Sequence, residues 1–201
     1  MVIGIDVGIS TTKIVGIDHE GKVISPLRIK ATDPVTSLYG AFGKFLHNNH
    51  VKLEEVEQVM ITGVGSGYID GPIYGRPTAK SDEFMADGLG ARYVTQLDHM
   101  IVVSMGTGTS LVQVQGDDIR HIGGVPIGGG TLMGLSRIML KTDNIDTITE
   151  LALQGNTGNI NVRIGDISPH PLPGLPMEAT ASLFGNARSN ASREDIAAGI
   201  I

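Results

Sequence analysis

Two segments of this chain combine the residue types that bind polyphosphates. In the first, an apolar run leads into a carboxylate, a glycine, three hydroxyls and a lysine: Asp6, Gly8, Ser10, Thr11, Thr12 and Lys13. Glycine lets the backbone approach a phosphate, hydroxyls and N–H groups donate hydrogen bonds, and lysine supplies positive charge. A carboxylate at the end of a buried strand is costly without a partner, so Asp6 is a candidate ligand of Mg²⁺, directly or through water. Taken alone, the segment is equally consistent with an ordinary hairpin that has a polar turn.

The second segment lies in the middle of the chain. Residues 100–103 are apolar, residues 111–114 alternate, and a small-residue turn joins them: Gly106, Thr107, Gly108, Thr109 and Ser110. Each segment therefore predicts a strand, a turn of glycines and hydroxyls, and a returning strand. Two such turns that face each other across a cleft suit a polyphosphate, and the pair indicates a nucleotide-using enzyme.

Two more glycine-rich stretches leave alternatives open. Residues 63–67 (Gly-Val-Gly-Ser-Gly) follow a short apolar strand, but their spacing and the nearby Pro72 and Pro77 argue against a dinucleotide site. They fit a loop that lines the substrate or a plain turn. Gly128, Gly129 and Gly130 open a helix. They would let a flat ring or a phosphate lie against the backbone, or simply give a flexible entry to a packed helix.

Hydrophobic periodicity and capping residues predict the elements that position these segments. Strands are expected at residues 2–6, 11–17, 22–30, 59–62, 100–115 (as a hairpin) and 118–122. Helices are expected from Asp33-Pro34 to residue 49, from a Ser81 cap to about residue 96, from residue 128, at about 146–154, and after Asn190 or Ser192. On periodicity alone, Glu83 is a negative charge near a helix N-terminus, where it interacts favourably with the helix dipole. The sequence shows no clear linker, only a hinge-like change near residues 95–100, where the second hairpin begins.

Composition excludes several functions. The chain has 201 residues, no cysteine and a net charge of −6. Without cysteine there is no disulfide, thiolate nucleophile, cysteine-bound zinc or protein-held iron–sulfur cluster. The negative charge argues against nucleic acid as a partner. Apolar stretches are only strand-length and Met1 leads directly into a strand, so we expect no membrane span, no signal peptide and a cytoplasmic location.

The two hairpins and the glycine-opened helix resemble the actin-like ATPase superfamily, and more closely the type II (eukaryotic-like) pantothenate kinases. The similarity covers nearly the whole chain. It rests on residues 4–8 (Gly-Ile-Asp-Val-Gly) with Lys13 and on the motifs at 106–110, 123–131, 151–155 and 181–186. The resemblance implies a two-lobed, ribonuclease H-like α/β fold, with one lobe at residues 1–97 and a partial second lobe at 98–201.

The same resemblance implies a reaction: ATP- and Mg²⁺-dependent phosphorylation of pantothenate to 4'-phosphopantothenate, the first step toward coenzyme A. By this analogy Glu83 is the general base, which is consistent with positioning-dominated phosphoryl transfer. Thr107 faces both phosphate and pantothenate, and Thr180-Ala181 closes over the substrate of the other subunit, which implies a homodimer. Gly123, Arg120 and His121 complete the implied substrate site, and coenzyme A or an acyl-CoA is a further candidate ligand as a feedback inhibitor.

Two departures from the family pattern leave other functions open. His121 stands where the family has an arginine, and Arg120, one residue earlier, points to the opposite face of a strand. A neutral imidazole would bind a carboxylate or phosphate more weakly. The family also continues past the position of Ile201, so an incomplete second lobe with an exposed apolar surface is expected. One alternative is an inactive regulator that binds nucleotide or acyl-CoA. The other is an activator ATPase of the 2-hydroxyacyl-dehydratase or benzoyl-reductase kind, which the lack of cysteine argues against.

Overall fold

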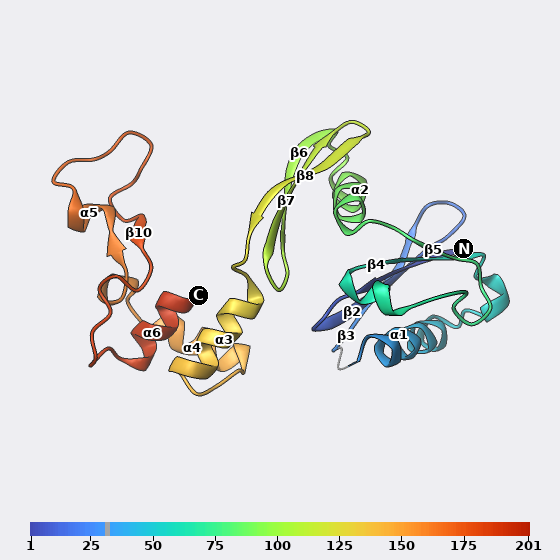
Figure 1. The fold of residues 1–201 in the computed structure, drawn as a ribbon, viewed down its shortest axis with the longest axis horizontal. Coiled ribbons are helices and arrows are strands. Elements are labelled where there is room, and N and C mark those ends of the chain that lie inside the picture. The colour runs from blue at the N-terminus through green and yellow to red at the C-terminus, as the bar shows by residue number, and fades with distance from the viewer. Residues whose placement is uncertain (31–32) are drawn as a thin grey trace. The chain divides into compact units, whose positions relative to one another are not determined.

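The computed structural model describes residues 1–30 and 33–201, which form two compact units, Met1–Gly124 and Val125–Ile201 (Figure 1). Both predicted hairpins lie in the first unit. The expected functional lobes, residues 1–97 and 98–201, stay a prediction. The compact units are divided at another place in the chain, between Gly124 and Val125.

A five-stranded sheet forms the centre of the first unit, in the order β3-β2-β1-β4-β5. Its strands are β1 (Val2–Val7), β2 (Thr11–Ile17), β3 (Val23–Lys30), β4 (Gln58–Thr62) and β5 (Thr78–Lys80). Strands β1 and β2 are antiparallel, as predicted, and so are β2 and β3, whereas β4 runs parallel to β1 and β5 runs parallel to β4. In β1 the side chains of Ile3, Ile5 and Val7 are buried, so the intervening residues, including Asp6, face the other side of the sheet.

Helix α1 (Pro34–Asn49) packs on the apolar side of this sheet. It begins where the sequence predicts, because Asp33 accepts a hydrogen bond from the Thr36 N–H (2.7 Å) and proline occupies the first turn. Leu38, Phe42 and Phe45 are fully buried against the strands. Short 3-10 turns follow at Leu53–Glu55 (η1) and Val64–Tyr68 (η2).

Helix α2 (Glu83–Thr95) leads into a three-stranded sheet of β6 (His99–Met105), β7 (Thr109–Gln115) and β8 (Asp118–Val125), in the order β6-β7-β8. The cap of α2 is Asp82, which accepts from the Met85 N–H (3.0 Å), so the prediction of Ser81 was wrong by one residue. The Ser81 backbone N–H instead donates to the Ile61 carbonyl, which holds Ser81 beside β4. Strand β8 also extends beyond residue 122, where the sequence predicted its end.

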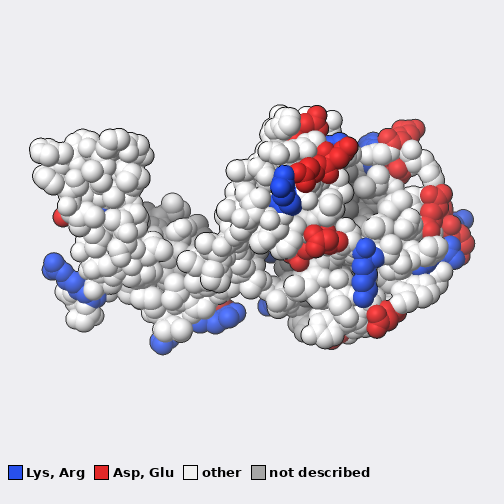
Figure 2. All heavy atoms as spheres, turned by 45° about the horizontal axis from the view of Figure 1, so that its top comes forward, with Lys and Arg blue, Asp and Glu red and all other residues white. Residues whose placement is uncertain are grey.

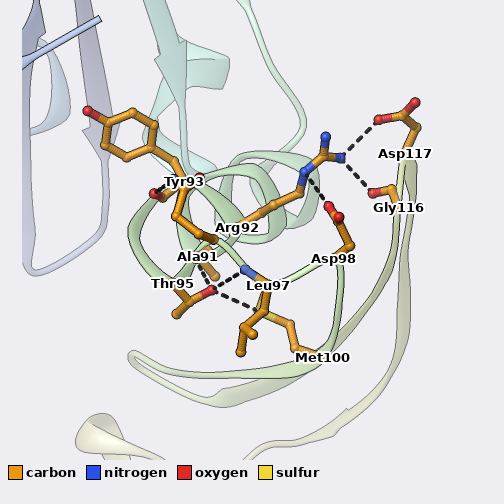
Figure 3. Close-up of polar contacts among 10 residues, drawn as sticks. Ala91, Arg92, Tyr93, Thr95, Leu97, Asp98, Met100, Gly116 and Asp117 are labelled. Carbon is orange, nitrogen blue, oxygen red and sulfur yellow. Dashed lines mark hydrogen bonds and ion pairs between the residues drawn. The ribbon is translucent and has the colours of Figure 1, made fainter.

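Contacts along α2 attach it to both sheets. Gly88 is buried so closely on the three-stranded sheet that an added Cβ would lie 2.5 Å from Ile119. Toward the end of the helix, Arg92 forms ion pairs with Asp98 (3.3 Å) and Asp117 (2.9 Å), as Figure 3 shows. On another side, the Tyr93 hydroxyl donates to the Gly21 carbonyl (2.7 Å) between β2 and β3. The helix is therefore fixed in the first unit from two directions.

The second unit is built mainly from helices. Its elements are α3 (Gly129–Met139), α4 (Ile145–Gln154), η3 (Thr157–Asn159), β9 (Val162–Arg163), α5 (Ile164–Ile167), β10 (Thr180–Ser182) and α6 (Arg193–Ile200). Leu140, Ile148, Ala197 and Ile200 form its small core. Of the two predicted caps for the last helix, Ser192 is the one that accepts from the Asp195 N–H (3.0 Å).

Within the described part of the chain, no helix has both the length and the apolar character needed to cross a membrane. On the face drawn in Figure 2, lysine and arginine side chains are scattered singly.

Candidate active site

The first turn is a tight hairpin that closes on its own backbone. Its Gly8 N–H donates to the Thr11 carbonyl (3.1 Å), and a Cβ on Gly8 would lie only 2.7 Å from that oxygen. Asp6 and Lys13 are cross-strand partners, and the Lys13 Nζ donates to Asp6 Oδ2 at 2.7 Å. Since Lys13 remains 59% exposed, its ammonium can also reach a ligand beside the turn.

The three hydroxyls of this turn differ in access. Ser10 is exposed and Thr11 is partly exposed. Thr12 is the cross-strand partner of Val7, so it faces the side of the sheet that α1 covers, and it is fully buried. Its Oγ1 has no hydrogen-bond partner. The predicted contact of Thr12 with a phosphate therefore has less structural support than those of Ser10 and Thr11.

The second turn joins β6 to β7. The Gly106 N–H donates to the Gly108 carbonyl (2.8 Å), and Thr107 at the tip is exposed. Strand β8 lies close by, because a Cβ on Gly124 would come within 2.5 Å of the Thr109 carbonyl. This close approach explains the glycine at residue 124, where there is no room for a side chain.

A threonine that the sequence did not single out lies beside Asp6. Thr62 at the end of β4 pairs in register with Asp6, and its buried Oγ1 has no hydrogen-bond partner. The Gly63 backbone packs directly against the Asp6 carboxylate, because a Cβ on Gly63 would collide with Asp6 Oδ1. Thr62 was missed because its signal, an unsatisfied buried hydroxyl next to a carboxylate, depends on strand register.

The Asp6 carboxylate is the kind of oxygen ligand that Mg²⁺ prefers, whereas the Thr62 Oγ1 beside it is buried. Mg²⁺ typically binds through one or two protein oxygens and keeps its remaining positions for water and substrate phosphates. The described residues contain no group of three or more His, Asp or Glu side chains that could hold a metal. A site that relies on Asp6 and on phosphate oxygens is consistent with both observations.

Glu83 is the first residue of α2 and lies within electrostatic range of the first turn. Its pKa is raised, first by desolvation and then by the negative charges of Asp6 and Asp87, whereas Lys13 lowers it. The influence of Asp6 and Lys13 places this carboxylate near the predicted phosphate site. A carboxylate with a raised pKa beside such a site is a candidate general base.

The structure separates Arg120 from His121, as strand alternation predicts. Arg120 forms an ion pair with Asp118 on its own strand (2.5 Å). His121 stacks on Phe84, the residue after Glu83, with ring centroids 4.1 Å apart and an angle of 17° between the planes. His121 and Glu83 are thus held in the same region, and Arg120 does not take the place of His121.

The remaining predicted residues belong to the second unit. Gly128 caps α3, and Gly129 and Gly130 form its first turn. Thr180 and Ala181 lie in the exposed strand β10. Two cavities of about 330 and 430 Å³ in this unit are lined by none of these residues. The role of these residues in the active site stays a prediction.

The fold is that of an actin-like ATPase. A solved structure, the activator of the 2-hydroxyisocaproyl-CoA dehydratase from Clostridium difficile with bound ADPNP, matches with a TM-score of 0.68, covering 99% of this chain and 70% of its own. At 14% sequence identity this similarity shows the fold alone.

Sequence relatives define the family. The Fumble family model matches residues 87–199. The type II pantothenate kinase of Staphylococcus epidermidis is 30% identical over 194 residues, which cover 92% of this chain and 67% of that protein. The type II pantothenate kinase of Bacillus cereus strain AH820 is 27% identical over 212 residues, covering 98% and 71%. This chain therefore belongs to the Fumble family of type II pantothenate kinases. The predicted fold class, family and kinase class are confirmed.

Proposed function

We propose that this protein transfers the γ-phosphoryl group of ATP to the primary hydroxyl of pantothenate, producing 4'-phosphopantothenate. The observation that carries this proposal is the position of Glu83 at the start of α2, where its pKa responds to Asp6 and Lys13 of the first turn. A base, a cation and a metal-binding carboxylate in one place are what phosphoryl transfer requires, because the reaction depends on positioning and on neutralising phosphate charge.

Each residue has a definite task in this scheme. Glu83 accepts the proton of the attacking hydroxyl. Lys13, now bound to Asp6, turns toward the phosphates when they bind, since its side chain is exposed. Backbone N–H groups of the two turns other than those of Gly8 and Gly106, together with Ser10 and Thr107, bind phosphate oxygens. Asp6 would hold Mg²⁺, which neutralises phosphate charge when it is bound.

The second unit carries the remaining predicted binding residues. Gly128, Gly129 and Gly130 would bind ATP through the exposed N–H groups at the start of α3. Family resemblance supports contacts of Thr180 and Ala181 with the substrate of a second subunit, and hence a homodimer. It also supports coenzyme A or an acyl-CoA as a feedback ligand, and a location in the cytoplasm. The similarity to a dehydratase activator is one of fold alone, and the chain has no cysteine to hold a cluster.

The direct test is to incubate the protein with ATP, Mg²⁺ and pantothenate and to follow the new phosphomonoester by ³¹P NMR. We expect 4'-phosphopantothenate to form only when both ATP and Mg²⁺ are present. Pantetheine and pantothenol, which keep the hydroxyl and lack the carboxylate, serve as comparison substrates. No turnover of any of the three, together with tight binding of ATP or coenzyme A, would replace the kinase proposal with a regulatory one.

The raised pKa of Glu83 predicts the pH dependence of the reaction. A general base must be deprotonated, so activity should rise with pH through the pKa of Glu83. Because desolvation and Asp6 raise this pKa, we expect the acidic limb of the kcat profile to lie above the ordinary value of 4.5. Measuring kcat between acidic and neutral pH at saturating ATP and pantothenate tests this. An acidic limb at or below the ordinary glutamate value would contradict it.

A further inference from the structure

The ring stack between Phe84 and His121 joins two elements at the position next to Glu83. Phe84 belongs to the first turn of α2, and His121 lies in the middle of β8. The planes are within 17° of parallel and the ring centroids are 4.1 Å apart, so the two rings contact each other face to face. The flat face of the imidazole therefore carries the contact.

The Ser81 N–H bond to the Ile61 carbonyl holds the chain just before α2, and the other contacts that anchor the helix lie farther along it. Gly88 packs on Ile119, while Arg92 and Tyr93 contact the strand connections near the helix end. Helix ends fray more readily than helix interiors, because their backbone groups have fewer partners. Glu83 is the terminal residue of α2, so its direction depends on what holds the first turn.

Strand alternation sets which side of β8 meets the helix. Ile119 and His121 are two residues apart, so they share the face of β8 that packs on α2, through Gly88 and Phe84. Arg120 lies between them, faces the opposite side, and is paired with Asp118. The Phe84–His121 stack is thus the continuation, toward the catalytic end of α2, of the contact that Gly88 makes in the middle of the helix.

We infer that Phe84 and His121 are positioning residues, which hold the first turn of α2 on β8 and so fix the direction of the Glu83 carboxylate. This inference rests on the proposed function for the role of Glu83. His121 acts in it through its flat ring and not through its charge. It assigns a role to the position at which this chain departs from the arginine of its family.

The test compares variants that keep or lose the stacked ring. Phe84→Leu and His121→Ala remove one ring each, while His121→Phe keeps a flat ring and removes both nitrogens. Misplacing a catalytic group by about 1 Å can cost a hundredfold in rate. We therefore expect Phe84→Leu and His121→Ala to lower kcat by about tenfold to a hundredfold with little change in the KM for ATP, and His121→Phe to stay within about threefold of wild type. His99→Phe, at an exposed histidine of β6, is the matched control.

Two results would overturn the inference. If His121→Phe loses as much activity as His121→Ala, the imidazole nitrogens act directly on the substrate. If Phe84→Leu retains the wild-type kcat, the stack does not position Glu83. The double variant Phe84→Leu/His121→Ala should be no slower than the worse single variant, because both changes remove the same contact.

A second measurement separates this inference from the proposed reaction. Amide hydrogen exchange of residues 84–87 reports the opening of the first turn of α2 without any substrate. We expect Phe84→Leu and His121→Ala to accelerate this exchange and His121→Phe to leave it near the wild-type rate. Unchanged exchange in all variants would overturn the inference even in an active enzyme. If the protein does not phosphorylate pantothenate while exchange responds as expected, the proposed function fails and the structural part of the inference stands.

Discussion

Replacing Glu83 by glutamine should lower kcat by about a hundredfold to ten-thousandfold, which is the usual contribution of a general base. The amide has nearly the same shape as the carboxylate, but it cannot accept the proton of the attacking hydroxyl. Because Glu83 lies near the phosphate turn and is not among the predicted phosphate ligands, the dissociation constant for ATP should change little. Single-turnover rates with pantothenate and binding isotherms with ATP measure the two quantities separately.

The stability of Glu83→Gln is a second expected result, and it shows whether a loss of kcat could come from unfolding. The pKa of Glu83 is raised in the folded state, so this group stabilises the fold below its ordinary pKa and loses that stabilisation as the pH rises through the folded value. At neutral pH its charge is therefore unfavourable, and Glu83→Gln should melt no lower than wild type. Glu150→Gln, at an exposed glutamate of α4, is the control. Equal kcat for Glu83→Gln and wild type would remove Glu83 as the base.

Local signals were sufficient to predict the elements around the first turn. Alternation predicted the β1–β2 hairpin, and the Asp33-Pro34 pair predicted the start of α1, because both signals act between residues close in sequence. The predicted cap of α2 was wrong by one residue, because Ser81 and Asp82 are both residue types that cap helices well and local sequence does not distinguish them. In the structure Asp82 accepts from the Met85 N–H, while the Ser81 N–H donates to the Ile61 carbonyl of a strand distant in sequence.

The contacts that organise the candidate site could not be predicted from the sequence, because they join segments that are distant in the chain. The register of β1 and β4 brings Thr62 beside Asp6, and no pattern within either strand specifies that register. The stack of Phe84 on His121 likewise depends on how α2 lies across β8. From the sequence, His121 was a weakened substrate ligand, whereas the structure shows its ring face in contact with an aromatic residue. Motifs predicted the chemistry of the site, and tertiary packing determines how its residues are held.

The loop at residues 63–67, for which the sequence left two interpretations open, contacts the first phosphate turn. Gly63 has φ 83° and ψ 160°, a backbone conformation that is essentially limited to glycine. A Cβ there would collide with Asp6 Oδ1 and lie 2.7 Å from the Val7 carbonyl. A Cβ on Gly65 would lie 2.6 Å from the Val7 side chain. This loop therefore supports Asp6 from behind and is more than a plain turn.

Gly63→Ala should accordingly reduce both stability and nucleotide binding. The unfavourable backbone conformation costs about 1–3 kcal/mol, and forced contacts in a packed site typically cost about 1–3 kcal/mol more. Since the Cβ displaces the Asp6 carboxylate, we expect Mg²⁺-dependent ATP affinity to fall at least about tenfold, which corresponds to ~1.4 kcal/mol. Urea unfolding and titration with ATP, with and without Mg²⁺, measure the two effects.

Two other glycines separate the causes. Gly71 has φ 77° but open space around its Cβ position, so Gly71→Ala should show the backbone cost without the loss of ATP affinity. A Cβ on Gly67 would meet nothing within 4 Å, and its φ is not positive, so Gly67→Ala should change neither quantity appreciably. If Gly63→Ala and Gly71→Ala lose the same stability and both keep Mg²⁺-dependent ATP binding, the loop does not position Asp6. The metal site would then depend on Asp6 and its strand neighbours alone.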